Sequence, residues 1–226
     1  MLKPKRKISK QDLKKDPFLE FINDSQKWLQ KRKKLIYQLL FGIVAVVLAV
    51  YFLSNNRSNS NVDSETLLGK ALLSQDLGDI ENSKFQLQSL VDDYAGTQAG
   101  IQGKYYLGKM VFDNGEFEIA SEYLKEFVKK GNNAILMTTA YKILSEIALQ
   151  NNDADQAEEY LQKGAKFSEG TVYEQEMSLL LANQLFENGK IDKAKSIVGN
   201  ILTKENILFS EKKSAEELMG RIEGEI

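Results

Sequence analysis

The sequence predicts an all-α protein, in which a single membrane-spanning helix precedes an α-solenoid of about four helical hairpins and a capping helix. Turn-like tripeptides recur every 37 residues, at 78–80, 115–117, 152–154 and 189–191. Self-similarity at a fixed period is typical of solenoids, because each repeat buries its apolar face against the next. An apolar stretch at 35–53 supplies the second observation, since its 19 residues would span about 28 Å as a helix.

The first 34 residues form a basic segment with 12 Lys/Arg and 4 Asp/Glu. The cations nearest the apolar stretch, which we expect to set the topology, are Lys31, Arg32, Lys33 and Lys34. Asp16 as a cap and Pro17 as the first helical residue predict that part of this segment is helical. Two interpretations stay open: an amphipathic helix on anionic lipid, or a topology signal that extends the anchor helix.

Residues 35–53 contain one polar interruption, Gln38, and have Tyr37 and Tyr51 near their ends, where aromatic rings favour the membrane interface. The long basic segment before them, and the lack of a clean cleavage site after them, favour an uncleaved anchor that contacts lipid. The positive-inside rule then predicts a single-pass protein of the bacterial inner membrane. Its N-terminus would be cytoplasmic, and the rest of the chain, with 18 Lys/Arg and 28 Asp/Glu, would lie in the periplasm.

Residues 54–61 contain no apolar side chain, so we expect 54–63 to be a flexible polar linker. The repeat domain would then occupy 64–226. Small residues follow each turn at an interval of five: Ser83, Ala120, Ala157 and Ala194. Larger apolar residues follow at an interval of nine: Leu87, Leu124, Leu161 and Val198.

Eight residues before the turn, the last three repeats carry leucine followed by a small residue, as in Leu107-Gly108, whereas the first repeat has Lys70. After the fourth repeat, Ala215, Leu218, Met219 and Ile222 mark one apolar helix face. This last helix is predicted to cap the array, with its charged residues outward, because an open end would leave apolar surface in water.

These columns resemble the tetratricopeptide repeat, a pair of antiparallel helices. The best copy runs from Tyr105-Tyr106-Leu107-Gly108 to Gly115-Glu116-Phe117 and Ala120. The period exceeds the usual 34 residues, and the usual closing proline is missing, since the chain's prolines are Pro4 and Pro17. We therefore expect a divergent repeat with longer turns between repeats.

Alignment with the repeat pattern predicts which first-helix positions face the concave side, as a candidate peptide-binding groove. These are Leu68, Leu72, Tyr105, Lys109, Phe112, Lys142, Glu146, Leu149, Leu179, Asn183 and Phe186. More than half are apolar, which suits an extended or helical apolar peptide. Tetratricopeptide domains that clamp a C-terminal carboxylate use lysine and asparagine where this chain has Leu68 and Leu72, so that mode is disfavoured. An open groove and a self-packed interior both remain possible.

The composition excludes several kinds of chemistry. The chain has no histidine and no cysteine, which removes Ser-His and Cys-His catalysis and the usual zinc ligands. Adjacent carboxylates, such as Asp92-Asp93 and Glu158-Glu159, are expected on solvated helix faces. An acidic repeat domain also disfavours nucleic acid. We predict no enzyme activity, no cofactor or metal, no small-molecule substrate, and other proteins as partners.

The whole architecture resembles the ancillary Sec-translocon subunit family (YfgM-like). The local resemblance lies in Asp63-Ser64-Glu65, Tyr94-Ala95-Gly96-Thr97, and the alanines Ala120 and Ala194. It implies a non-catalytic, chaperone-like scaffold that links the translocon and exported clients to periplasmic chaperones. The basic N-terminus is longer than is usual in that family. The alternative is a membrane-tethered scaffold for envelope or cell-wall assembly.

Overall fold

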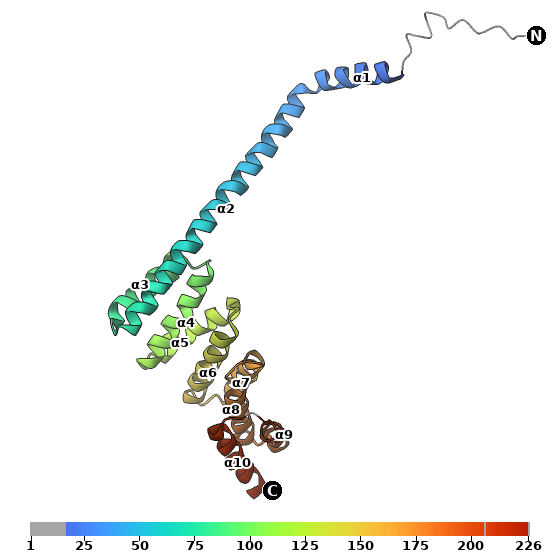
Figure 1. Cartoon of the computed structure of the whole chain (residues 1–226). Coiled ribbons are helices and arrows are strands. Elements are labelled where there is room, and N and C mark those ends of the chain that lie inside the picture. The colour runs from blue at the N-terminus through green and yellow to red at the C-terminus, as the bar shows by residue number, and fades with distance from the viewer. Residues whose placement is uncertain (1–16, 206, 226) are drawn as a thin grey trace, which may run out of the picture. The chain divides into compact units, whose positions relative to one another are not determined.

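The computed structural model describes residues 17–205 and 207–225, with the backbone alone for 17–20, 36 and 49–59. The described residues contain helices and turns but no strand, so the all-α prediction is confirmed for them. The helices are α1 (Pro17–Lys31), α2 (Lys33–Asp76), α3 (Ile80–Asp93), α4 (Gln98–Asp113), α5 (Phe117–Lys130), α6 (Ala134–Gln150), α7 (Ala154–Ser168), α8 (Glu174–Glu187), α9 (Ile191–Leu202) and α10 (Phe209–Gly224) (Figure 1).

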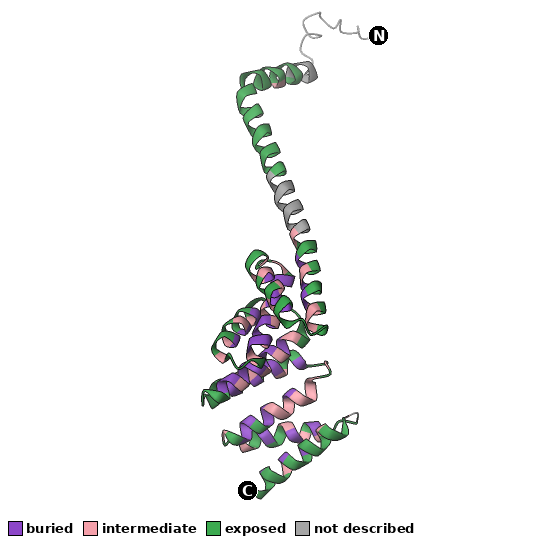
Figure 2. Cartoon of the chain, turned by 90° about the vertical axis from the view of Figure 1, so that its left-hand side faces the viewer, coloured by how far each residue is buried: buried purple, intermediate pink, exposed green. Residues whose placement is uncertain are grey.

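The chain divides into two compact units between Ser58 and Asn59. In the first unit, α1 and α2 are separate helices with Arg32 in a turn between them. The large apolar side chains of α2 in this unit, such as Leu39, Phe41 and Val46, are exposed (Figure 2). They take no part in a core of the described residues.

Within the part of the chain that the structure describes, no helix combines the length and apolar character needed to cross a bilayer. Ile36 and residues 49–53 of the predicted span lie outside the residues whose side chains are described. The membrane span therefore stays a prediction from the sequence.

The polar segment at 54–63 differs from its prediction, because the structure places it inside α2 rather than in an irregular linker. Serine and asparagine favour turns when their side chains compete for backbone hydrogen bonds. Once a helix has formed on either side, however, propagation through such residues costs little. At the end of this segment, the Ser64 hydroxyl donates to the Asn61 carbonyl at 2.9 Å, within the helix itself.

The second unit is a solenoid of helical hairpins, in which each helix from α3 onward packs against the next one in the chain. Three consecutive apolar cores run along it: the first joins α2 to α4, the second α4 to α7, and the third α7 to α10. Because neighbouring cores share helices, each repeat is stabilised mainly by the repeats beside it.

The four predicted turns all adopt the left-handed backbone conformation. The φ angles are 80° at Gly78, 82° at Gly115, 57° at Asn152 and 71° at Gly189. Glycine has no Cβ to clash in this region, and asparagine tolerates it better than most residues. The 37-residue interval thus marks the reversal between the two helices of each hairpin.

The residues that recur at fixed intervals after the turns form the core of the solenoid. All four small residues that follow the turns are fully buried, as are Leu87, Leu124 and Val198. Gly108 shows why its column requires small residues, because a Cβ there would lie 2.8 Å from Leu124 Cγ. In the first repeat, Lys70 stands where the later repeats have a leucine, and its side chain is exposed.

Helix α10 covers the end of the array, as predicted, but not all of its charged residues point outward: Glu211, Glu217 and Arg221 lie toward α8. Its Ala215, Leu218 and Ile222 are buried in the third core, and Met219 is half-buried against it. The helix packs on both α9 and α8. That second contact places its polar residues next to the first helix of the fourth repeat.

Candidate protein-binding groove

The predicted concave positions fall into three groups. Leu68, Tyr105 and Phe186 are buried. Leu149 and Asn183 are exposed. The half-buried members are Leu72, Lys109, Phe112, Lys142, Glu146 and Leu179. The predicted set therefore combines residues that pack into the solenoid with residues that a partner could reach.

Tyr105 and Phe112 of this set pack against other aromatic rings of the solenoid. The Tyr105 ring lies 5.1 Å from Tyr106 and 5.4 Å from Phe127, measured between ring centroids. Burial raises the pKa of the Tyr105 phenol. Phe112 packs in the same way, 5.5 Å from Phe117. These rings hold α4 against α5 instead of lining an open surface.

Charged residues link the first helices of the third and fourth repeats. Lys142 Nζ in α6 pairs with Glu176 Oε1 in α8 at 2.5 Å. One turn beyond Lys142, burial raises the pKa of Glu146; the Glu176 charge raises it further, and Lys142 lowers it. Lys142 is thus the shared cation of two carboxylates, Glu146 and Glu176, so this part of the concave side has a net negative charge.

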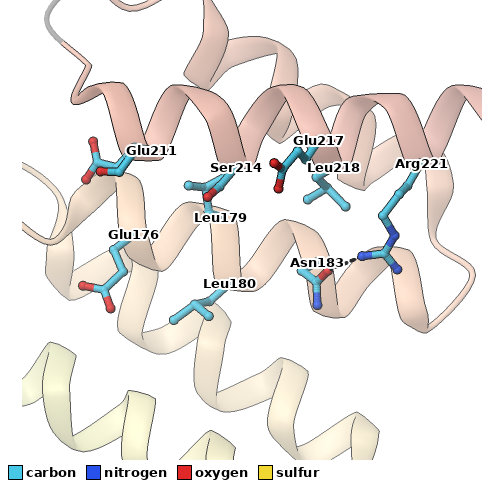
Figure 3. A pocket seen from close by; sticks show the side chains of 10 residues that line it. Glu176, Leu179, Leu180, Asn183, Glu211, Ser214, Glu217, Leu218 and Arg221 are labelled. Atoms are coloured by element: carbon cyan, nitrogen blue, oxygen red, sulfur yellow. Dashed lines mark hydrogen bonds between the residues drawn. The ribbon is translucent and has the colours of Figure 1, made fainter.

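A groove of about 560 Å³ lies between α8 and α10. The residues from α8 are Glu176, Leu179, Leu180 and Asn183, and those from α10 are Ser210, Glu211, Ser214, Glu217, Leu218 and Arg221. Figure 3 shows the side chains of the two helices facing each other across this space. Of the predicted set, the groove includes Leu179 and Asn183.

Arg221 closes one end of the groove. Its Nη1 donates to Asn183 Oδ1 at 3.1 Å (Figure 3). Its Nη2 pairs with Glu187 Oε1 at 2.6 Å. Its guanidinium carbon lies 4.7 Å from the centroid of the Phe186 ring. A cation over an aromatic face is attracted by the ring quadrupole. These contacts hold Arg221 against α8, and Glu187 neutralises its charge.

The rest of the groove combines an apolar surface with an acidic border. Leu179, Leu180 and Leu218 supply the apolar part, whereas Glu211 and Glu217 of α10 and Glu176 of α8, which pairs with Lys142, lie at its border (Figure 3). Arg221 is the one cation among the described residues that line it, and it is already paired. The groove therefore suits a segment that carries a cationic side chain next to an apolar one.

A second charged cluster has a structural role. Glu158 of α7 is buried, and its oxygens accept bonds from Lys190 Nζ at 2.7 and 2.8 Å and from Asn188 Nδ2 at 2.7 Å. Burial raises the pKa of Glu158, but the bonds from Lys190 and Asn188 outweigh it, so the pKa lies below its usual value. The prediction that Glu158 is solvated was wrong, because the turn after α8 covers it; Glu159 is exposed, as expected.

The residues that carry the translocon-family resemblance contribute to the fold. Ser64 is a buried residue of α2. Thr97 caps α4, accepting a bond from the Gly100 amide at 3.0 Å. Ala120 and Ala194 are fully buried. None of these lines the groove between α8 and α10.

The sequence pattern of a family described as "Tetratricopeptide repeat-like domain" matches residues 26–168, which is more than half of the chain. No curated protein matches the chain.

Two solved structures share the repeat architecture. The first, described as a kinesin light chain of Podosopora anserina with nearly identical TPR-like repeats, is 16% identical with a TM-score of 0.53. That match covers 71% of this chain and 85% of the other. The MamA protein is 18% identical with a TM-score of 0.52, over 74% of this chain and 88% of its own. At this identity the likeness shows the fold alone.

Proposed function

Because the chain belongs to the tetratricopeptide repeat-like domain family, we propose that it is a non-catalytic scaffold whose α8–α10 groove holds segments of other proteins. An apolar groove with an acidic border, built on a repeat array, supports this function. Tetratricopeptide-like arrays present extended surfaces of this kind to partners. The chemistry of the groove favours a partner segment with lysine or arginine beside an apolar residue.

We further propose that residues 35–53 anchor the scaffold in the bacterial inner membrane. Their apolar side chains in the described part of α2 are exposed, and a helix that is apolar on all sides needs an apolar environment. The family match begins at residue 26 and so includes this segment. The cations at 31–34 favour a cytoplasmic N-terminus, with the repeats in the periplasm.

A membrane-anchored array in the periplasm would meet proteins as they emerge from the translocon. With the resemblance described above, this supports a role as an accessory of the Sec translocon that links exported clients to chaperones. A scaffold for envelope or cell-wall assembly is the second candidate, and it has the same fold and topology.

Co-purification in mild detergent tests the binding surface and separates the two candidates. Glu217 lines the groove, whereas its neighbour Glu216 does not, and each faces a lysine four residues earlier. We expect Glu217→Lys to reduce the recovered partners several-fold and Glu216→Lys to leave them unchanged. Translocon subunits among those partners would support the first candidate; outer-membrane or wall-synthesis proteins would support the second. Equal recovery with both variants would contradict the groove as the binding surface.

The absence of cysteine from the chain allows a direct test of the topology. A single cysteine at the exposed Asn200 of α9 should react with a membrane-impermeant maleimide once the outer membrane is permeabilised. A single cysteine at Ser9 should react only after the inner membrane is disrupted. The opposite order of labelling would rule out the proposed orientation.

A further inference from the structure

Helix α1 has one apolar face that no described part of the protein covers. Phe21 is 70% exposed, Trp28 55% and Leu29 49%. Together with Asp24 and Ser25, these residues line one shallow hollow along the helix. Their spacing places the apolar residues on one face, with Lys27 and Lys31 on the other. A large uncovered apolar face on an amphipathic helix indicates an interaction surface.

The break at Arg32 separates this surface from the predicted anchor. The Arg32 amide bonds both the Trp28 and Leu29 carbonyls, at 3.2 and 3.3 Å, and α2 then begins at Lys33. The Arg32 guanidinium carbon lies 5.3 Å from the centroid of the Trp28 ring. This break argues against an uninterrupted helical extension of the anchor. It also places a cation at the edge of the apolar face.

We propose that α1 lies along an anionic lipid surface, with Phe21, Trp28 and Leu29 at the boundary between headgroups and acyl chains. The inference rests on the membrane anchoring proposed above, which would hold α1 next to the bilayer through the short connection at Arg32. Residues 21–34 carry five Lys/Arg and one carboxylate, Asp24. An anionic leaflet attracts cations that lie near its surface.

A second copy of the chain is a less suitable occupant. A parallel pair of α1 helices joined through their apolar faces would bring two clusters of Lys31–Lys34 close together, and an antiparallel pair would leave both clusters without a counter-charge. Like charges at short range oppose the parallel pair. Anionic lipid offers both an apolar boundary for the aromatic residues and negative charge for these cations.

Trp28 reports on this surface directly, because it is the chain's only tryptophan. The full-length protein is inserted into nanodiscs of phosphatidylcholine alone or with phosphatidylglycerol, and acrylamide quenching of Trp28 is measured. We expect the quenching constant to fall several-fold, with blue-shifted emission, in discs that contain phosphatidylglycerol. Phe21→Ser with Leu29→Ser should abolish the difference. The matched polar-face pair Asn23→Ser with Gln30→Ser should retain it.

Protein that co-elutes with both kinds of disc while Trp28 stays equally quenchable would overturn the inference and leave the anchor intact. Protection of Trp28 from acrylamide that is equal in both discs, or that depends on the number of chains per disc, would overturn the inference. It would indicate that protein covers the apolar face of α1. Failure to co-elute with either disc would contradict the anchor itself, and the lipid-bound helix with it.

Discussion

At the scale of single residues, Ser83 departs from the repeat pattern in a way that should cost stability. It occupies the column where the later repeats have alanine, it is fully buried, and its hydroxyl has no hydrogen-bond partner among the described atoms. We predict that Ser83→Ala raises the free energy of unfolding by about 1 kcal/mol, because a buried unpaired hydroxyl is removed.

Chemical denaturation of the full chain in detergent, followed by circular dichroism, measures this change. Ser168→Ala is the matched control, since the Ser168 hydroxyl is equally buried but donates to the Ala165 carbonyl at 2.8 Å. That variant should lower the free energy of unfolding by about 1 kcal/mol. If both substitutions lowered the free energy of unfolding by similar amounts, the Ser83 hydroxyl would have a hydrogen-bond partner in the folded protein.

The buried carboxylate of Glu158 should make stability depend on pH. Its folded-state pKa is lower than its unfolded value, so its contribution is present above about pH 4.5 and is lost as the pH falls through the folded pKa. Glu158→Gln should lower the free energy of unfolding by about 2 kcal/mol at neutral pH.

Denaturation curves recorded from neutral pH down to about pH 3 test this, and the difference between wild type and Glu158→Gln should shrink on acidification. Glu159→Gln is the control. The pair that it breaks with Lys163 is exposed and should contribute under about 0.5 kcal/mol. A difference that stays constant with pH would exclude the Glu158 carboxylate as its source.

At the scale of elements, α10 has two roles: it closes the third core and forms one side of the groove. Deleting residues 206–226 would expose the apolar face of α8 and α9 that Ala215, Leu218 and Ile222 cover. We predict much faster amide hydrogen exchange in α8 and α9, with little change in α4 and α5, because repeats are stabilised mainly by their neighbours. Uniform acceleration from α3 to α9 would instead indicate one cooperative unit.

The sequence was sufficient to predict the hairpins because their determinants are local. A residue that tolerates positive φ, such as Gly115, and small residues at close contacts, such as Ala120, appear directly in the spacing. The helical state of 54–63 could not be predicted in this way. Its side chains favour turns, and its helicity comes from the helix that continues on either side.

The groove was predicted only in part, for a related reason. The turn positions gave the register of α2, α4, α6 and α8, and so identified Leu179 and Asn183. No repeat turn follows α10, so the pattern could not show that Glu217 and Arg221 face α8. The burial of Glu158 also lacked a local signal, because its partner Lys190 lies 32 residues later.

At the scale of the whole molecule, opposite charges separate along the chain. Residues 1–34 carry a net charge of +8, and the remaining residues −10. We interpret the first charge as a signal for cytoplasmic retention and lipid contact. The second surrounds the repeats, where it favours partners with basic segments and disfavours nucleic acid.

We propose that the groove between α8 and α10 holds segments of other proteins. Photo-crosslinking in cells tests it most directly, with a photoreactive residue at Asn183 in the groove and at the exposed Asn200 of α9 as the control. We expect protein adducts from position 183 that disappear when Glu217→Lys is added, and few from position 200. Equal adducts from both positions, or adducts at 183 that persist with Glu217→Lys, would contradict it.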